Sequence, residues 1–184
     1  GYQVLKYWVA DQNEFVRIQN GILDAPIYRY AEVLLINAEA NAELGTATQT
    51  VIDNTINLLR QRAGMPNMVI GSLQKDSKSD FPDIPVLLDE IRRERRVELA
   101  IEGLRFEDLI RWKAGALLNK PVLGMKFIQS KYPKAVIGTS IFVDANGFIL
   151  PYGKSLPGGR TFDENKHYLL PLPLDELSLN TKLK

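Results

Sequence analysis

His167 is the only histidine in the chain, and the sequence contains no cysteine. A serine, histidine and aspartate triad would have to use His167, and no Gly-x-Ser-x-Gly motif accompanies it. A zinc site needs several histidine or cysteine ligands, which this composition cannot supply. Glycine-rich phosphate loops are also absent. We therefore predict no catalytic residue, no bound metal and no cofactor.

Neighbouring carboxylates are the next candidates for chemistry, because glycoside hydrolysis uses two carboxyl groups that face each other. Glu107 and Asp108 form one such pair, and Asp175 and Glu176 form another. Adjacent residues of a helix diverge by about 100° and do not face each other. We therefore interpret both pairs as solvated or capping charges.

Four arginines gather in one short run, at positions 92, 93, 95 and 96. Guanidinium groups bind phosphates, so a phosphate or nucleic-acid site is one interpretation. Acidic residues interleave with the run and neutralise it locally: Asp89, Glu90, Glu94 and Glu98. This pattern favours a salt-bridge network between helices over anion binding.

Exposed aromatic rings are the usual means of recognising sugars, because a sugar presents CH faces for stacking and hydroxyls for hydrogen bonding. Tyr7 and Trp8 lie near the N-terminus, outside any strong helical pattern, and are our candidate ligand-binding residues. Trp112 falls within a helical motif, where packing between helices is the better interpretation. Tyr152 follows a predicted hairpin.

The composition is that of an ordinary globular domain, with 45% hydrophobic and 24% charged residues. Lysine and arginine number 23 against 22 aspartate and glutamate residues, so the chain lacks the basic excess of nucleic-acid-binding proteins. No apolar run approaches the ~18 residues that a membrane-spanning helix needs.

Hydrophobic periodicity predicts helices through residue 118. The first covers residues 28–44 and ends at Gly45; the second follows a capping box at Thr46 and Gln49 and ends at Gly64. The third begins near residue 84, with Asp83 as its cap, and runs to a stop at Gly103. A fourth begins near Arg105. Each pair of helices is close to the ~34-residue unit of tetratricopeptide-type hairpins.

Loop composition separates the two pairs over residues 67–83, and the chain becomes rich in glycine and proline after residue 118. Asn146-Gly147 lies between apolar runs and predicts a type I′ β-hairpin near residues 141–150. Two prolines in YLLPLP forbid a central strand, so this stretch is predicted to be extended. The fold class is therefore mainly α, with a loop-rich C-terminal region over residues 119–184.

Four blocks resemble the SusD/RagB family of nutrient-binding outer-membrane lipoproteins in their order along the chain. They are YRYAEVLLINAEANAELG from Tyr28, INLLRQRAGMP from Ile56, ERRVELAIEGLRFEDLIRW from Glu94 and YLLPLPLDELSLN from Tyr168. Leu104 and Glu107 depart from the pattern, which usually has a histidine and a second aromatic there. Members of the family are longer and carry a signal peptide and a lipid-modified cysteine, so we expect a C-terminal part of one SusD-like domain.

The resemblance implies a binding protein without catalytic activity. It would capture an oligosaccharide or other nutrient at the surface of a Bacteroidetes-type bacterium and pass it to a SusC-type TonB-dependent transporter. Its membrane attachment would be an N-terminal lipid anchor outside this chain. The alternatives are a tetratricopeptide-like protein-interaction scaffold without a small-molecule ligand, and a glycan-active enzyme whose catalytic domain lies elsewhere.

The family's recurrent charged positions are matched by a further set of residues. We hypothesise that several of them pair across the helix stack and fix its register. They are Arg29, Glu32, Glu39, Arg60, Arg62, Glu94, Arg95, Glu98, Arg105, Asp108 and Arg111.

Overall fold

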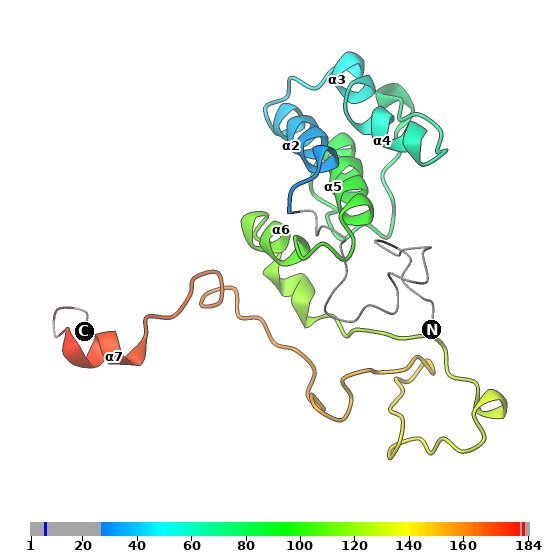
Figure 1. Cartoon of the computed structure of the whole chain (residues 1–184), viewed down its shortest axis with the longest axis vertical. Coiled ribbons are helices and arrows are strands. Elements are labelled where there is room, and N and C mark those ends of the chain that lie inside the picture. The colour runs from blue at the N-terminus through cyan, green and yellow to red at the C-terminus, as the bar shows by residue number, and fades with distance from the viewer. Residues whose placement is uncertain (1–5, 7–26, 181, 183–184) are drawn as a thin grey trace, which may run out of the picture. The chain divides into compact units, whose positions relative to one another are not determined.

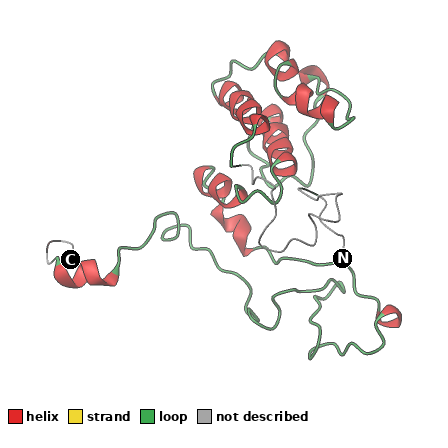
Figure 2. Cartoon of the chain, in the orientation of Figure 1, coloured by secondary structure: helices red, strands yellow, loops and turns green. Residues whose placement is uncertain are grey.

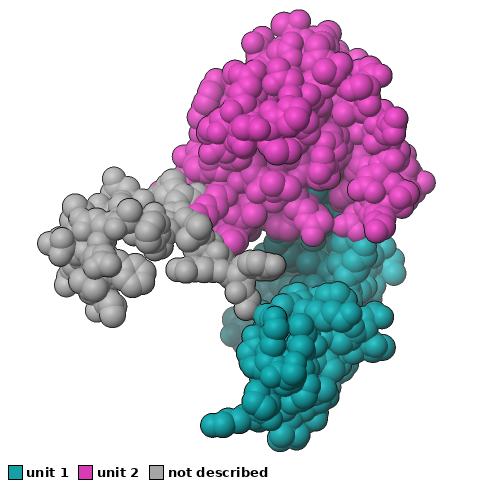
Figure 3. Space-filling model, turned by 90° about the vertical axis from the view of Figure 1, so that its right-hand side faces the viewer, with its two compact units in different colours: residues 1–3, 106–184 teal, residues 4–105 magenta. Residues whose placement is uncertain are grey.

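The computed structural model describes residue 6, residues 27–180 and residue 182 (Figure 1). The chain divides into two compact units (Figure 3). We call residues 4–105 the helical unit, and residues 106–184 with residues 1–3 the loop-rich unit. The described residues form helices joined by loops, without a named strand (Figure 2). The predicted mainly α class is confirmed.

Two long helices, α2 (Tyr30–Glu43) and α5 (Val86–Glu98), pack against each other in the helical unit. The short helices α3 (Gln49–Asp53) and α4 (Ile56–Arg62) also contact α2 (Figure 1). The core lies between these four helices and includes several fully buried side chains: Leu35, Ala38, Ile52, Ile56 and Ile91. A continuous apolar core of this kind supplies most of the stability of short helices.

The prediction for α2 is confirmed to within two residues at each end. Ala31, Leu34, Leu35 and Ala38 follow helical spacing and are buried. Gly45 has φ +69°, the left-handed conformation that commonly terminates a helix and that glycine adopts without strain. The chain therefore leaves α2 at the glycine that the sequence indicated.

The single helix predicted for residues 46–64 is wrong, because Asn54 and Thr55 divide it into α3 and α4. The Thr55 hydroxyl donates to the carbonyl of Val51 at 2.6 Å, and the Thr55 backbone leaves the helical region at φ −131° and ψ −88°. Side-chain to backbone bonds of this kind compete with helical ones. Gly64, with φ +68°, follows the end of α4 as predicted.

The predicted capping box is also wrong, because Thr48 rather than Thr46 caps α3. The Thr48 hydroxyl accepts a hydrogen bond from the Val51 N–H at 3.3 Å. Gln49 bonds the following loop instead: its amide donates to the Met68 carbonyl at 2.9 Å and accepts from the Ile70 N–H at 3.0 Å. A short 3₁₀ helix, η1 (Ile70–Ser72), begins there.

α5 begins after Pro85, without a side-chain cap, so the predicted Asp83 cap is wrong. The helix ends at Glu98, several residues before the predicted stop at Gly103. Ile101 and Gly103 both have positive φ, +68° and +84° respectively. Cationic side chains bind the Glu98 carbonyl at this end of the helix, as described below.

The loop-rich unit contains most of α6 (Arg105–Arg111), the 3₁₀ helices η2 (Gly115–Asn119) and η3 (Gln129–Lys131), and α7 (Leu174–Leu179). A helix starting at Arg105 is confirmed. It ends before residue 118 because Lys113 takes φ +50°, which breaks the helical path. None of the helices in the described part of the chain is both long and apolar enough to cross a bilayer.

A hairpin-like turn occurs where Asn146-Gly147 predicted one, and an antiparallel bridge joins Val143 to Ile149 across it. Its predicted type I′ geometry is wrong, since only Gly147 has positive φ. The Asp144 carboxylate accepts hydrogen bonds from the N–H groups of Asn146 and Phe148, at 2.9 and 2.8 Å. This aspartate-centred turn, followed by a left-handed glycine, replaces the type I′ turn.

Candidate functional site

Charged side chains converge on the C-terminal end of α5 in the helical unit. Arg29 donates to both oxygens of the Glu102 carboxylate, from Nε at 3.0 Å and from an Nη at 2.6 Å. The same Nη lies 3.0 Å from the Glu98 carboxylate. The hydrogen bond from Arg29 lowers the pKa of Glu102 to about 2, and Lys6 adds to this effect. The pKa of Arg29 is raised by the same contact.

The carbonyl groups at this helix end are also capped by cations. Lys6 Nζ donates to the Glu98 carbonyl at 2.7 Å and to the Ala100 carbonyl at 2.8 Å, and pairs with the Glu102 carboxylate. Arg29 donates to the Glu98 carbonyl at 3.2 Å. Cations stabilise the C-terminus of a helix because the last carbonyls are unpaired and carry partial negative charge.

A second cluster joins α4 to α5. Arg60 pairs with Glu94 and lies 2.8 Å from the Glu90 carboxylate, while Arg62 lies 2.6 Å from Glu98. Arg93 also pairs with Glu90, one helical turn earlier. The hydrogen bond from Arg93, with added attraction from Arg60, lowers the pKa of Glu90.

Two buried arginines of α5 face acidic residues of α2. Arg92 lies 3.0 Å from Glu43 and 3.9 Å from Glu39, and Arg95 lies 3.7 Å from Glu32. Both arginines are less than one-tenth exposed. The Arg92 guanidinium also lies 5.1 Å from the centroid of the Phe81 ring, within cation–π range.

The structure thus brings many of the predicted charged residues into ion pairs between α2, α4, α5 and the segments beside them. Arg111 and Asp108 instead pair one turn apart within α6, at 3.0 Å. Arg92 and Glu90 belong to the run that the sequence predicted to form salt bridges, whereas the sequence prediction omitted Lys6, Glu43 and Glu102. Spacing offered a signal for two of them, because Glu43 and Glu102 lie one helical turn beyond Glu39 and Glu98.

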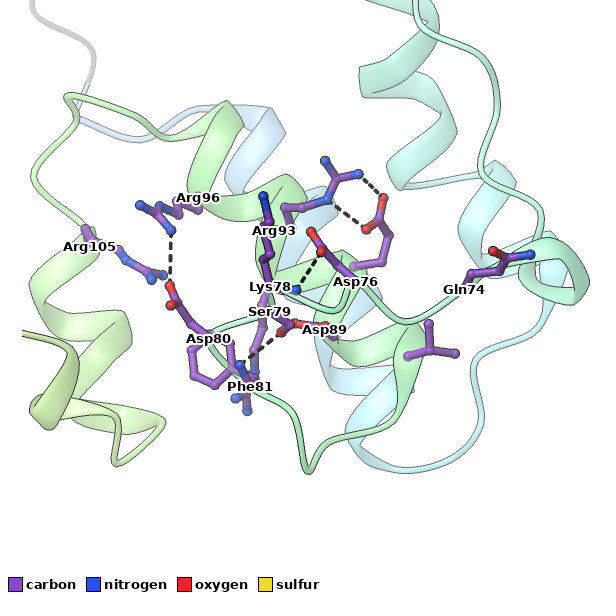
Figure 4. Close-up of a pocket in the computed structure, with 13 residues that line it drawn as sticks. Gln74, Asp76, Lys78, Ser79, Asp80, Phe81, Asp89, Arg93, Arg96 and Arg105 are labelled. Atoms are coloured by element: carbon purple, nitrogen blue, oxygen red, sulfur yellow. Dashed lines mark hydrogen bonds and ion pairs between the residues drawn. The ribbon is translucent and has the colours of Figure 1, made fainter. Parts of the chain in front are cut away.

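A small cavity lies beside α5 and the loop before it, with a volume of about 140 Å³ (Figure 4). Arg105, the remaining predicted charged residue, lines it. Asp80 lies 3.4 Å from Arg96, and Ser79 donates to Asp89 at 2.8 Å. The volume is below the ~300 Å³ at which small-molecule pockets usually begin. Ion pairs and hydrogen bonds already engage these side chains, so this cavity is a weak candidate for a ligand.

A larger hollow of about 750 Å³ lies in the loop-rich unit, and we call it the aromatic hollow. Its lining includes Phe127, Tyr132, Lys131, Lys134 and Ile149. The rings of Phe127 and Tyr132 are stacked, with centroids 6.0 Å apart and planes 19° apart. The volume falls in the range of ligand pockets, and the paired rings suit the CH face of a sugar.

Two backbone arrangements build the aromatic hollow. On one side, Ile149 donates to the Met125 carbonyl at 3.0 Å and Phe127 donates to the Gly147 carbonyl at 2.8 Å, beside the Asp144 turn. On the other side, the Gln129 amide donates to the carbonyls of Tyr132 and Ala135, at 3.2 and 3.0 Å. These bonds hold the loop that carries Tyr132 and both lysines.

The sequence-based ligand candidates lie elsewhere. Tyr7 and Trp8 fall outside the described residues. Trp112 is half-buried, with the Arg111 guanidinium 4.8 Å from its ring centroid, and Tyr152 is exposed outside the lining of the aromatic hollow. Sequence reasoning missed Phe127 and Tyr132. The available signal was the stretch KFIQSKYPK, where aromatic and basic residues alternate in a loop.

His167 has a structural position in the loop-rich unit. Its Nδ1 accepts a hydrogen bond from the Asp163 N–H at 2.9 Å, and its ring meets Phe162 edge-on at 5.5 Å. Among the described residues no group of histidine and carboxylate side chains has the arrangement of a metal site.

The sequence matches known proteins along its whole length. The model of the SusD family matches residues 1–184. SusD-like protein P2 of Formosa agariphila is 33% identical over 159 residues, which is 84% of this chain and 24% of that protein. SusD-like protein P38 of the same organism is 32% identical over 99 residues, covering 54% of this chain and 19% of that protein. The chain thus spans about a quarter or less of these relatives.

Two solved structures from Bacteroides fragilis share the fold. One, described as a SusD-like carbohydrate-binding protein, has a TM-score of 0.61 and 30% identity, and the match covers 87% of this chain and 28% of that one. The other, a SusD-like protein, has a TM-score of 0.53 and 27% identity, covering 84% and 24%.

Proposed function

The chain belongs to the SusD family, and from this membership we propose that it is a glycan-binding component of an outer-membrane uptake system. In this proposal the protein captures an oligosaccharide at the cell surface and delivers it to a SusC-type TonB-dependent transporter. A lipid anchor of the full-length protein holds it at the outer membrane. It binds its ligand and leaves it chemically unchanged.

One observation carries the glycan-binding part of this proposal: the 30% identity to a solved SusD-like carbohydrate-binding protein over 87% of the chain. The aromatic hollow adds physical support, because its volume and its stacked rings suit a sugar.

The ion pairs have a separate role in the proposal. Pairs such as Arg60 with Glu94 and Arg92 with Glu43 join different helices of the helical unit. Buried and bidentate pairs need a defined geometry, so a shifted helix would lose several of them together. We propose that they fix the register of the helices within this unit.

A glycan array with the labelled protein tests the central proposal, followed by calorimetric titration of each glycan that binds. We expect saturable binding to at least one class of oligosaccharide. Absence of binding to every glycan would contradict the proposal and favour a protein-interaction scaffold. Release of shorter sugars during incubation would instead identify an enzyme.

Delivery to a transporter requires its own measurement. The tagged protein should copurify with an outer-membrane TonB-dependent transporter after mild cross-linking in the native bacterium. A tagged, unrelated surface lipoprotein of the same cells is the matched control. Equal recovery of the transporter with the protein and with the control lipoprotein would show that the transporter is not a specific partner. The glycan array tests glycan capture independently of this result.

A further inference from the structure

The charged side chains that line the aromatic hollow are all positive. Among the residues that the structure describes, Lys131, Lys134 and the phenol of Tyr132 are the only ionisable groups in its lining, which includes no carboxylate. The small cavity beside α5 differs, since Asp76, Asp80, Asp89 and Glu90 line it together with its arginines and lysine. The described lining of the aromatic hollow therefore carries two formal positive charges and no negative one.

Among the described residues, these two lysines lack the glutamate partners that several arginines of the helical unit have. No ion pair within 4 Å joins either ammonium group to another residue in the described ranges, and both side chains are exposed. In the helical unit, by contrast, Arg29, Arg60 and Arg62 each pair with a glutamate. Lys131 and Lys134 are thus available to a ligand without the loss of an internal contact.

Backbone bonds keep the two lysines and the rings on one short loop. Gln129 binds the carbonyls of Tyr132 and Ala135, and the Ala135 N–H donates to the Tyr132 carbonyl at 3.0 Å. η3 ends at Lys131, directly before Tyr132. Lys131 and Lys134 therefore flank Tyr132 in the same loop, and all three residues line the aromatic hollow.

We infer that the aromatic hollow binds an anionic glycan, in which carboxylate or sulfate groups meet Lys131 and Lys134 while a sugar face stacks on Phe127 and Tyr132. The inference rests on the proposed glycan-binding function and specifies the class of glycan and the residues that select it. Ammonium groups attract both kinds of anion as point charges, so the shared chemistry is a negatively charged sugar.

Calorimetric titration with three purified oligosaccharides tests this inference: oligogalacturonate, which carries carboxylates, carrageenan oligosaccharide, which carries sulfates, and neutral galacto-oligosaccharide. The protein variants are Lys131→Gln with Lys134→Gln, Tyr132→Ala, and a control with Lys154→Gln and Lys166→Gln. The control removes two exposed lysines of the same unit that lie outside the lining. Circular dichroism verifies that each variant is folded.

We expect at least one anionic probe to bind about tenfold or more tightly than the neutral probe. Raising the salt from about 0.1 M to about 1 M shortens the Debye length from about 10 Å to about 3 Å and should remove most of this preference. The lysine pair variant should bind anionic probes about tenfold more weakly and the neutral probe equally well. Tyr132→Ala should weaken the binding of every probe. The control variant should bind each probe with the same affinity as the unaltered protein.

The outcomes separate this inference from the proposed function. Equal affinity for neutral and anionic probes overturns the inference and supports glycan binding. Anionic binding that the lysine pair variant leaves unchanged overturns the assigned site. No binding of these probes or of any arrayed glycan overturns both proposals.

Discussion

Arg29 and Glu102 form a two-pronged ion pair, with Nε to Oε2 at 3.0 Å and Nη to Oε1 at 2.6 Å. The pair ties the residue before α2 to the turn after α5, across 73 positions of sequence. Glu98 and Lys6 add further contacts at the same place. A single cluster of charged side chains therefore links the start of α2 to the end of α5.

Glu102→Gln should destabilise the protein, because the neutral amide keeps the shape of the side chain and loses the charge that Arg29 and Lys6 bind. We expect the free energy of unfolding at pH 7 to fall by about 1 kcal/mol, since the pair is partly accessible to solvent. Urea denaturation measures the change. Glu107→Gln, at an exposed residue without an ion pair to a described residue, is the control and should have no measurable effect.

The stability contributed by Glu102 should depend on pH. Arg29 holds the pKa of Glu102 at about 2 in the folded protein, below the ordinary glutamate value of 4.5. The folded state therefore binds this proton less readily, and the contribution is fully present above pH 4.5 and declines as the pH falls toward 2. The difference in unfolding free energy between the unaltered protein and Glu102→Gln should shrink over this window. A difference that stays constant from pH 7 to pH 3 would contradict the assignment.

Asn57→Ala should destabilise the helical unit more strongly. The buried Asn57 amide accepts from the Met68 N–H at 2.6 Å and donates to the Met68 carbonyl at 3.1 Å. Removing the amide leaves the Met68 N–H without this partner, at a cost of about 1–3 kcal/mol, while Gln49 still donates to the Met68 carbonyl. Thermal and urea unfolding measure the loss. The exposed Asn54→Ala change should cost less than about 1 kcal/mol, and equal costs would argue against a role for the Met68 contact.

Gly115→Ala should disturb the packing around η2. A Cβ at this position would lie 2.1 Å from Cε1 of Phe162, whose ring also meets the rings of His167 and Tyr168. The ring must move, and we expect a cost of about 1–3 kcal/mol with faster amide hydrogen exchange near residues 115–119 and 162–168. Gly158→Ala is the control, because a Cβ there meets no atom within 4 Å. Unchanged exchange in Gly115→Ala would show that the ring moves at no cost.

Helix existence was predictable because the pattern of apolar residues is local. The buried residues of α2 repeat at helical spacing, and Gly45 and Gly64 mark two helix ends through their backbone freedom. The cations at the end of α5 were not predictable in this way, because Lys6 and Arg29 come from distant parts of the sequence. The break at Thr55 was also unpredictable, because it accompanies a hydrogen bond from the Thr55 hydroxyl to the Val51 carbonyl, which a sequence does not distinguish from a hydrogen bond to water.

The candidate site was less predictable than the scaffold. Alternating charge indicated ion pairing near α5, and the structure adds partners such as Glu43 that only the packing of α2 on α5 selects. Phe127 and Tyr132 lie in a loop without periodicity, so nothing local distinguishes a stacked pair from two separate rings. Their proximity depends on the bonds of Gln129 and on the pairing of Phe127 with Gly147.

The Lys6 contact also has a consequence for the timing of biosynthesis. Its ammonium group binds the Glu98 carbonyl across 92 positions of sequence. At roughly 5–20 residues per second, translation takes about 5–18 s to proceed from Lys6 to Glu98. The lysine is therefore synthesised well before its acceptor exists, and the nascent chain cannot complete this end of α5 until the helix itself has left the ribosome.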